Sequence, residues 1–222
     1  MAIQIQHIQK SYRKKPVLRD VSITVEPGTC VGILGANGSG KSTFLSILAG
    51  VQRADGGCFF HDGVDLLRNG KTRAAMVGYV PQGTPLIEEL TAWDNLLLWY
   101  EPSEARKQLE EGVLQLLGIG EFLKVPVSKM SGGMKKRLSI GCAMAHNPSV
   151  LLLDEPTAAL DLACKQRITL WLQQYKANGG TLLLATHDVP ELALCDQWYI
   201  LKEGTLEPFA FDGDVARLVE RL

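Results

Sequence analysis

Residues 30–50 read CVGILGANGSGKSTFLSILAG, and this stretch decides the fold. It begins with a short, continuous apolar run rich in β-branched side chains, which is typical of a strand buried on both faces of a parallel sheet. The run ends in glycines, and a helical pattern follows from Lys41 to Ala49. The order strand, glycine-rich loop and helix predicts one unit of an α/β fold.

The loop GANGSGKS, residues 35–42, fits the pattern G-x-x-x-x-G-K-S/T in the context that the pattern requires. Chance produces such a match in roughly one of a hundred sequences of this length. Glycines let backbone N–H groups converge on a phosphate, and the helix N-terminus adds partial positive charge. We expect Lys41 to neutralise phosphate oxygens and the Ser42 hydroxyl to ligate Mg²⁺. The alternative is a glycine-rich turn that only joins strand to helix.

The same order of elements recurs further along the chain. VLLLDEP (150–156) precedes a helical pattern over 162–176, and TLLLATH (181–187) precedes a short one near Glu191. QWYILKEG (197–204) is the last predicted strand. Repeated strand-then-helix units predict a parallel sheet.

The N-terminal region has a different pattern. Residues 3–25 alternate apolar and polar positions around a turn-like break at 12–16, and a further strand is predicted near 58–61. We expect a small antiparallel layer formed by about residues 1–30 and 56–66.

A mostly helical insert is predicted over about residues 88–147. This region has little strand pattern, and its helical stretches include 98–118 and 132–146. Residues 1–222 are therefore expected to form a single domain of the α/β class, with an antiparallel layer and a helical insert.

Two adjacent carboxylates, Asp154 and Glu155, follow the apolar run VLLL. They lie at the carboxyl end of a predicted parallel strand, where open α/β sheets bind ligands. Neighbouring strand residues point to opposite sides, so the two carboxylates are expected to have different roles. We predict Asp154 near the metal, through water, and Glu155 polarising an attacking water. A solvated strand end is the alternative.

Bulk composition excludes several classes of protein. The chain has 222 residues, 46% of them hydrophobic, and a net charge of −1 from 23 basic and 24 acidic residues. This charge balance provides no basic stripe for nucleic acid and no polybasic membrane anchor. The apolar runs are far shorter than the roughly 20 residues of a membrane span, and no signal-peptide pattern is present. The five cysteines form no C-x-x-C pair and are expected to be reduced thiols in the cytosol.

The segment KMSGGMKKR, residues 129–137, closely resembles the signature motif of the ATP-binding cassette (ABC) family. The order of all the motifs in the chain matches that family as well. The resemblance implies a P-loop NTPase core, and it implies that Ser131, Gly132 and Gly133 contact the γ-phosphate of ATP held by another subunit. Ser131 as a helix N-cap is an alternative that is compatible with this role.

The resemblance assigns further positions in this sequence. Tyr12 would stack on adenine, Gln82 would touch Mg²⁺ and water, and His187 would orient Glu155 and the water. Asp161 would lie in a loop that crosses the dimer interface, although a helix N-cap is equally compatible with it. The implied ATP contacts are Tyr12, Val17, Gly35, Ala36, Asn37, Gly38, Ser39, Gly40, Lys41, Ser42 and Thr43, and the implied metal ligands are Ser42, Gln82 and Asp154.

Two residues depart from the family pattern. Met134 stands where glutamine usually follows Ser-Gly-Gly, and Ala159 stands where glycine usually precedes Leu-Asp. Loss of one neutral hydrogen bond at Met134 would weaken contact with the partner's nucleotide by about 0.5–1.5 kcal/mol. Residues 88–96, EELTAWDNL, together with the signature variant, look most like ATPases of exporters that have separately encoded membrane subunits.

The resemblance implies a Mg²⁺-dependent ATPase that pairs with a second cassette and docks on an integral membrane permease at the cytoplasmic face. A soluble ABC ATPase that remodels a macromolecular complex is one alternative. A nucleotide-gated interaction protein with vestigial hydrolysis would be expected to lack Glu155 or His187, and both are present. A small-molecule kinase would share the phosphate loop but would leave residues 131–133 unexplained.

Overall fold

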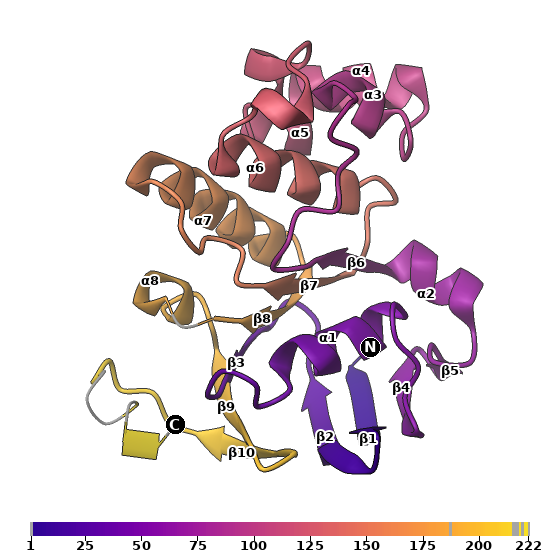
Figure 1. Ribbon diagram of the computed structural model, residues 1–222, viewed down its shortest axis with the longest axis vertical. Coiled ribbons are helices and arrows are strands. Elements are labelled where there is room, and N and C mark those ends of the chain that lie inside the picture. Colours follow the sequence, from indigo (N-terminus) through magenta and orange to yellow (C-terminus); the bar gives the residue numbers. More distant parts are fainter. Residues whose placement is uncertain (1, 187, 215–217, 219, 222) are drawn as a thin grey trace.

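The computed structural model describes residues 2–186, 188–214, 218, 220 and 221. Within these residues, ten strands form one mixed sheet in the order β5-β4-β1-β2-β10-β9-β3-β8-β7-β6. Figure 1 shows the helices α3 to α7 stacked above one part of this sheet, with α1 on its other side. The expected α/β fold is confirmed.

Part of the sheet, called the central sheet below, is parallel and ends at the edge strand β6. It contains β3 (Cys30–Leu34), β8 (Thr181–Ala185), β7 (Val150–Asp154) and β6 (Val77–Val80). Every residue of β3, β7 and β8 is buried, as the continuous apolar runs predicted. The carboxyl ends of these strands therefore meet at one edge of the sheet.

Two strands at the C-terminal end extend the sheet on the other side of β3. β9 (Gln197–Lys202) pairs parallel with β3, and β10 (Thr205–Phe209) pairs antiparallel with β9. A single parallel pair, Thr205 with Asp20, joins β10 to β2. The antiparallel region is thereby continuous with the central sheet.

The antiparallel part of the sheet comprises β1 (Ile3–Tyr12), β2 (Lys15–Val25), β4 (Gly56–His61) and β5 (Val64–Asp65). The break expected over residues 12–16 is a two-residue turn, Arg13-Lys14, with φ values of 45° and 70°. Positive φ at both central positions is the hallmark of the hairpin turns that match strand twist. The strands therefore extend further toward the turn than the sequence pattern predicted.

The helical region is built from short elements. They are α3 (Ala92–Leu96), α4 (Pro102–Glu111), α5 (Val113–Leu116), η1 (Ile119–Phe122), η2 (Val127–Lys129) and α6 (Gly132–Ala143). The predicted helical stretch over 98–118 is interrupted, because Pro102 begins α4 and Gly112 separates α4 from α5. α6 ends at Ala143, three residues before the predicted end at His146.

The remaining helices connect strands. α1 (Lys41–Ala49) follows the phosphate loop, and α2 (Gly70–Met76) precedes β6. α7 (Leu162–Ala177) links β7 to β8, and α8 (Val189–Leu192) lies between β8 and β9. Both α1 and α7 lie where the sequence predicted helices.

Alternation along the central strands divides the interior into two cores. Leu151 and Leu153 of β7 pack with Leu138 of α6 and Ile168 of α7. The intervening strand residues belong to a second core, which contains the buried face of α1 and the antiparallel strands. Leu151 and Leu153 of β7 therefore face the helical region, whereas Val150 and Leu152 face α1 on the other side of the sheet.

Four of the five cysteines are buried and all five thiols are free. Among the described residues, no helix combines the length and the apolar character that crossing a membrane requires.

Candidate functional site

The phosphate loop turns sharply between β3 and α1. Gly35, Gly38 and Gly40 have φ values of 151°, 81° and 111°, which side chains rarely adopt. A Cβ on Gly40 would also lie 3.0 Å from Cγ1 of Val17. Val17, one of the implied ATP contacts, is therefore packed beside the loop.

Lys41 is folded back onto its own loop. Its side chain is buried, with 6% of the residue exposed, and Nζ donates hydrogen bonds to Gly35 O at 2.6 Å and Ala36 O at 3.1 Å. Burial lowers the pKa of Lys41, whereas the nearby charges of Glu155 and Asp154 raise it. The ammonium group is thus held at the loop, within the field of both carboxylates.

Ser42 and Asp154 meet from different elements. Ser42 lies in the first turn of α1, and Asp154 is the last residue of β7. Burial raises the pKa of Asp154, which is only 3% exposed, while a hydrogen bond with the Ser42 side chain opposes that rise. A hydroxyl and a buried carboxylate side by side, next to a phosphate loop, provide the oxygen donors that Mg²⁺ prefers.

Gln82 and Glu155 are joined by a hydrogen bond. Gln82 follows β6, and its Nε2 donates to Oε2 of Glu155 at 2.9 Å. Glu155 has a φ of 48°, and its backbone N–H donates to Ala185 O at 2.8 Å. The chain turns at Glu155 immediately after the strand. Glu155 and Asp154 therefore have different partners, and a left-handed turn at Glu155 takes the place of the simple strand alternation that was expected.

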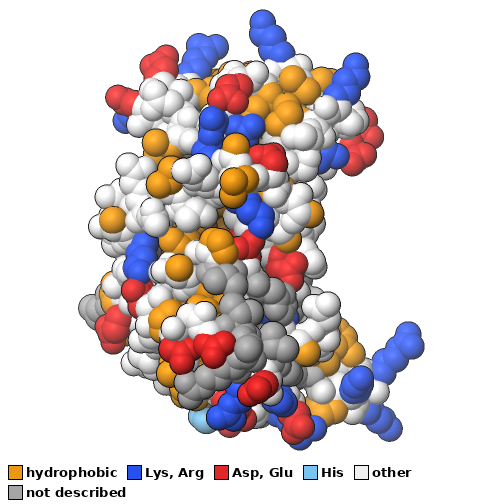
Figure 2. Space-filling view, turned by 90° about the vertical axis from the view of Figure 1, so that its left-hand side faces the viewer, with side chains coloured by type: hydrophobic (Ala, Val, Ile, Leu, Met, Phe, Trp, Pro, Cys, Tyr) orange, Lys and Arg blue, Asp and Glu red, His pale blue; other side chains and the backbone are white. Residues whose placement is uncertain are grey.

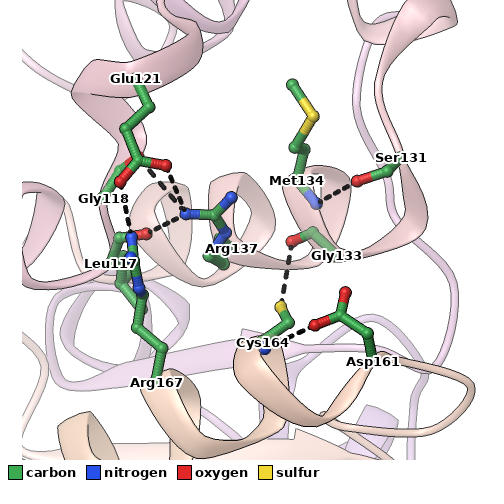
Figure 3. A network of polar contacts seen from close by, with 10 residues as sticks. All are labelled: Leu117, Gly118, Glu121, Ser131, Gly133, Met134, Arg137, Asp161, Cys164 and Arg167. Carbon is green, nitrogen blue, oxygen red and sulfur yellow. Dashed lines mark hydrogen bonds and ion pairs between the residues drawn. The ribbon is translucent and has the colours of Figure 1, made fainter.

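The signature segment begins a helix. Ser131 is the N-cap of α6, and its Oγ accepts a hydrogen bond from Met134 N at 3.2 Å. Gly133, in the first turn, packs closely on α7: Cys164 Sγ contacts Gly133 O at 3.7 Å, and a Cβ on Gly133 would lie 2.9 Å from that sulfur (Figure 3). The capping role of Ser131 is present, and glycine is needed at position 133 for this packing.

An arginine from α6 and an arginine from α7 both contact residues 117–121. Arg137 Nη1 donates to Leu117 O at 2.9 Å and lies 3.6 Å from Oε2 of Glu121. Arg167 Nη1 donates to Oε1 of the same carboxylate at 2.9 Å (Figure 3). Gly118, with a φ of 63°, leaves room for the Arg167 guanidinium. Glu121 thus bridges one arginine from each helix.

Asp161 is the N-cap of α7, since its Oδ1 accepts from Cys164 N at 2.8 Å. Ala159, two residues earlier, has a φ of 57°. The left-handed conformation is unfavourable for a residue with a Cβ, which explains why glycine is usual at this position. Alanine in place of glycine at position 159 therefore strains the backbone, but it leaves the N-cap at Asp161 intact.

The predicted adenine contact, Tyr12, lies at the end of β1. The residue is 43% exposed, its hydroxyl donates a short hydrogen bond to Gln52 Oε1, and Lys10 Nζ lies 5.5 Å from the ring centroid. These contacts hold the ring beside the segment that follows α1. Stacking on adenine stays a prediction, and His187 lies outside the described residues.

Two charged residues near the site were missed by the sequence reasoning. Lys136 is 4% exposed, and its Nζ donates to Pro81 O and Gln82 O, each at 3.0 Å. Glu191 is buried and accepts a short hydrogen bond from Thr186 Oγ1, which itself accepts from Asp188 N at 2.9 Å. In sequence, Lys136 belongs to a run of three basic residues, and Glu191 is the acidic residue of a short predicted helix. Either pattern is typical of a solvated face.

A cavity of about 630 Å³ adjoins the site on the side of the helical region. Its lining residues include Ser42, Gln82, Asp154, Trp99 and His146. Trp99 and Leu98 are more than half exposed. An exposed apolar side chain of the helical region, Trp99, therefore forms part of the wall of a cavity that Gln82 also lines.

The loops that lead into α1, α6 and α7 lie on the left-hand side of Figure 1, which is the face turned toward the viewer in Figure 2. Gly40, Ser131 and Asp161 are the N-caps of these three helices. In the described part of this face, Lys and Arg side chains are interspersed with Asp and Glu (Figure 2). Three helix N-termini therefore open on a face of mixed charge.

The family model described as "ABC transporter" matches residues 18–158. The linearmycin resistance ATP-binding protein of Bacillus subtilis is 33% identical over 210 residues, with 92% of this chain and 67% of the relative covered. The Nod factor export ATP-binding protein I of Sinorhizobium fredii is 36% identical over 210 residues, with 92% and 61% covered. The chain thus spans about two thirds of the length of these curated relatives.

Solved structures agree with this assignment. A dimeric ATP-binding cassette in a post-hydrolysis state, bound to ADP and Pi, superimposes with a TM-score of 0.81 at 29% identity, covering 92% of this chain and 96% of that one. The ATP binding subunit of an ABC transporter gives a TM-score of 0.84 at 26% identity, covering 99% and 94%. This chain therefore belongs to the ABC transporter family, as an ATP-binding subunit that hydrolyses ATP.

Proposed function

We propose that this chain energises export of a substrate through a separate membrane permease, by hydrolysing MgATP between itself and a second cassette. The observation that supports this most directly is the convergence of Ser42, Asp154, Gln82 and Glu155 beside the phosphate loop. The relatives named for Nod factor export and linearmycin resistance favour export as the direction.

The residues at the loop fit a magnesium ion. Ser42 Oγ, the Gln82 side-chain oxygen and, through water, Asp154 would hold it, and Mg²⁺ when bound neutralises charge on the β- and γ-phosphates. Lys41 would exchange its contacts with Gly35 O and Ala36 O for phosphate oxygens. The lysine is already aimed at the loop, so little reorganisation is required.

Glu155 is the proposed base for the attacking water. Its contact with Gln82 and its backbone hydrogen bond to Ala185 O fix where the carboxylate points. His187 is the proposed partner that orients Glu155 and the water. Tyr12 and Val17 would bind the adenosine, and residues 35–43 the phosphates.

The second ATP contact comes from the other cassette. We propose that Ser131, Gly132, Gly133 and Asp161 contact the nucleotide of the partner, so that two ATP molecules close a head-to-tail dimer. A pair of identical chains would form an isologous interface. Opening after hydrolysis is then the step coupled to transport.

The permease is proposed to dock at the cavity beside Gln82. The apolar lining of the cavity and the exposed side chains of Trp99 and Leu98 suit an apolar segment of a membrane subunit. Gln82 lines the same cavity, so a bound segment would contact it directly. Such docking would hold the chain peripherally on the cytoplasmic face of the membrane.

The test is Mg²⁺-dependent ATPase activity as a function of protein concentration, for wild type and Glu155→Gln, with the mutant's mass measured in ATP. We expect activity that rises more than linearly with concentration, and an inactive mutant that dimerises only with ATP. A mutant that stays monomeric in ATP and still hydrolyses it would refute the scheme.

A further inference from the structure

Lys136 is an unusual buried cation. It lies in the second turn of α6, five residues after Ser131, and it is 4% exposed. Among the described residues, no carboxylate oxygen lies within ion-pair distance of its Nζ. A buried ammonium group is costly unless its hydrogen bonds are satisfied, so the acceptors that it does use are informative.

Those acceptors are two consecutive backbone carbonyls. Lys136 Nζ donates to Pro81 O and to Gln82 O, at 3.0 Å each. These carbonyls lie in the segment that leaves β6, and both residues line the 630 Å³ cavity. A charge-assisted bond to a carbonyl is stronger than a neutral one, and two such bonds from one ammonium fix both the distance and the direction of the segment.

The contact continues to the catalytic carboxylate. The main-chain oxygen of Gln82 accepts a hydrogen bond from Lys136 Nζ, and its side-chain Nε2 donates one to Glu155 Oε2 at 2.9 Å. An unbroken series of polar contacts therefore runs from the signature helix through Gln82 to Glu155. Ser131, at the start of the same helix, is the proposed contact with the partner's nucleotide.

We propose that Lys136 is a positioning residue that couples the location of the signature helix to the orientation of Gln82 and Glu155. This inference rests on the proposed roles of Ser131 and Glu155. When α6 shifts to engage the partner's nucleotide, the ammonium group shifts the Gln82 backbone with it, so that Glu155 is oriented for catalysis only in the closed dimer. Lys136 is not one of the residues proposed to contact either nucleotide.

The neighbouring lysine is a matched control. Lys135 lies on the same helix, but its Nζ is 3.5 Å from Glu88 Oε1 at the surface. Lys136→Met keeps the length of the side chain without its donors, Lys136→Gln keeps N–H donors without the charge, and Lys135→Met removes an equivalent charge from the same helix.

We expect Lys136→Met to lower kcat by about 100-fold, as small misplacements of catalytic groups do, with KM for MgATP unchanged within about twofold. Lys136→Gln should recover part of the loss, and Lys135→Met should match wild type. In the Glu155→Gln background, Lys136→Met should still dimerise with ATP, because the phosphate loop and Ser131 are intact. Wild-type kcat in folded Lys136→Met would overturn the inference, as would an equal loss of nucleotide affinity and kcat.

A double-mutant cycle with Gln82→Ala tests the route. If Lys136 acts through Gln82, adding Lys136→Met to Gln82→Ala should cause no further loss of kcat, whereas multiplicative losses would contradict the route. Amide hydrogen exchange provides a readout that needs no activity: Lys136→Met should speed exchange in residues 82–86 and leave α1 unaffected. If wild type is inactive or Glu155→Gln remains active, the proposed function itself fails. If wild type is active and Lys136→Met leaves exchange in residues 82–86 unchanged, only the inference about Lys136 is refuted.

Discussion

The thiol of Cys164 contacts the carbonyl oxygen of Gly133, 3.7 Å away, at the point where α7 meets the first turn of α6. The Cα of Gly133 faces the same sulfur, because a Cβ built there would lie 2.9 Å from Sγ. The first turn of α7 and the signature segment thus share one close contact within a single chain.

Gly133→Ala should therefore be destabilising. Overpacking of this kind costs about 1–3 kcal/mol, and we expect a loss of that size in the free energy of unfolding, measured with urea. Cys164→Ala in the same chain should recover most of the loss, because it removes the obstructing sulfur. An additive double mutant would show that the clash is not the cause.

Ala159→Gly should stabilise the chain. A left-handed residue with a Cβ costs about 1–2 kcal/mol, and part of the gain is offset by the greater flexibility of glycine in the unfolded state, so a net increase of about 0.5–1 kcal/mol is expected. Ala158→Gly is the matched control, since Ala158 is also exposed but does not have a positive φ. It should destabilise the chain slightly. Thermal unfolding of both variants would decide the matter.

Glu191→Gln should change the pH dependence of stability. Burial is the main cause that raises the pKa of Glu191 above its ordinary 4.5. The folded state therefore binds the carboxyl proton of Glu191 more tightly than the unfolded state does. The contribution of this group to the free energy of unfolding falls as pH rises from about 4.5 through the folded pKa. The substitution should raise Tm more at pH 8 than at pH 5. Glu207→Gln, on the exposed part of β10, should show no such difference.

Asp154→Asn should separate nucleotide binding from metal binding. The phosphate loop is unchanged in this variant, so ATP with EDTA should raise its Tm as in wild type. Adding Mg²⁺ should give wild type a further rise that the variant lacks, because a buried carboxylate at the Ser42 hydroxyl has been lost. An equal response to Mg²⁺ in both proteins would exclude Asp154 from the metal site.

The sequence predicted what depends on local pattern. The phosphate loop, the apolar strands β3, β7 and β8, and the helix from Lys41 to Ala49 all follow from short-range rules of periodicity and glycine use. The individual helices within the helical region were predicted less well, because Pro102 and Gly112 interrupt a pattern that is otherwise helical.

Residues whose environment is set by distant elements were not predictable. Lys136 reads as one of three consecutive basic residues, and only the packing of α6 on the segment after β6 buries it against two carbonyls. Glu191 is equally ordinary in sequence, and it becomes buried because α8 folds back onto Thr186. The left-handed turn at Glu155 carries no sequence signal of its own.

The shared face of three helix starts has an electrostatic consequence. Peptide dipoles give each helix N-terminus about half a positive charge. The N-caps of α1 and α6 are Gly40 and Ser131, which carry no charge that would cancel it. A chain with a net charge of −1 thereby gains a local positive potential where a triphosphate would bind. Because the backbone is the source of this potential, the attraction for anions persists through most surface substitutions. Unlike a patch of lysines, it does not attract long polyanions such as nucleic acids.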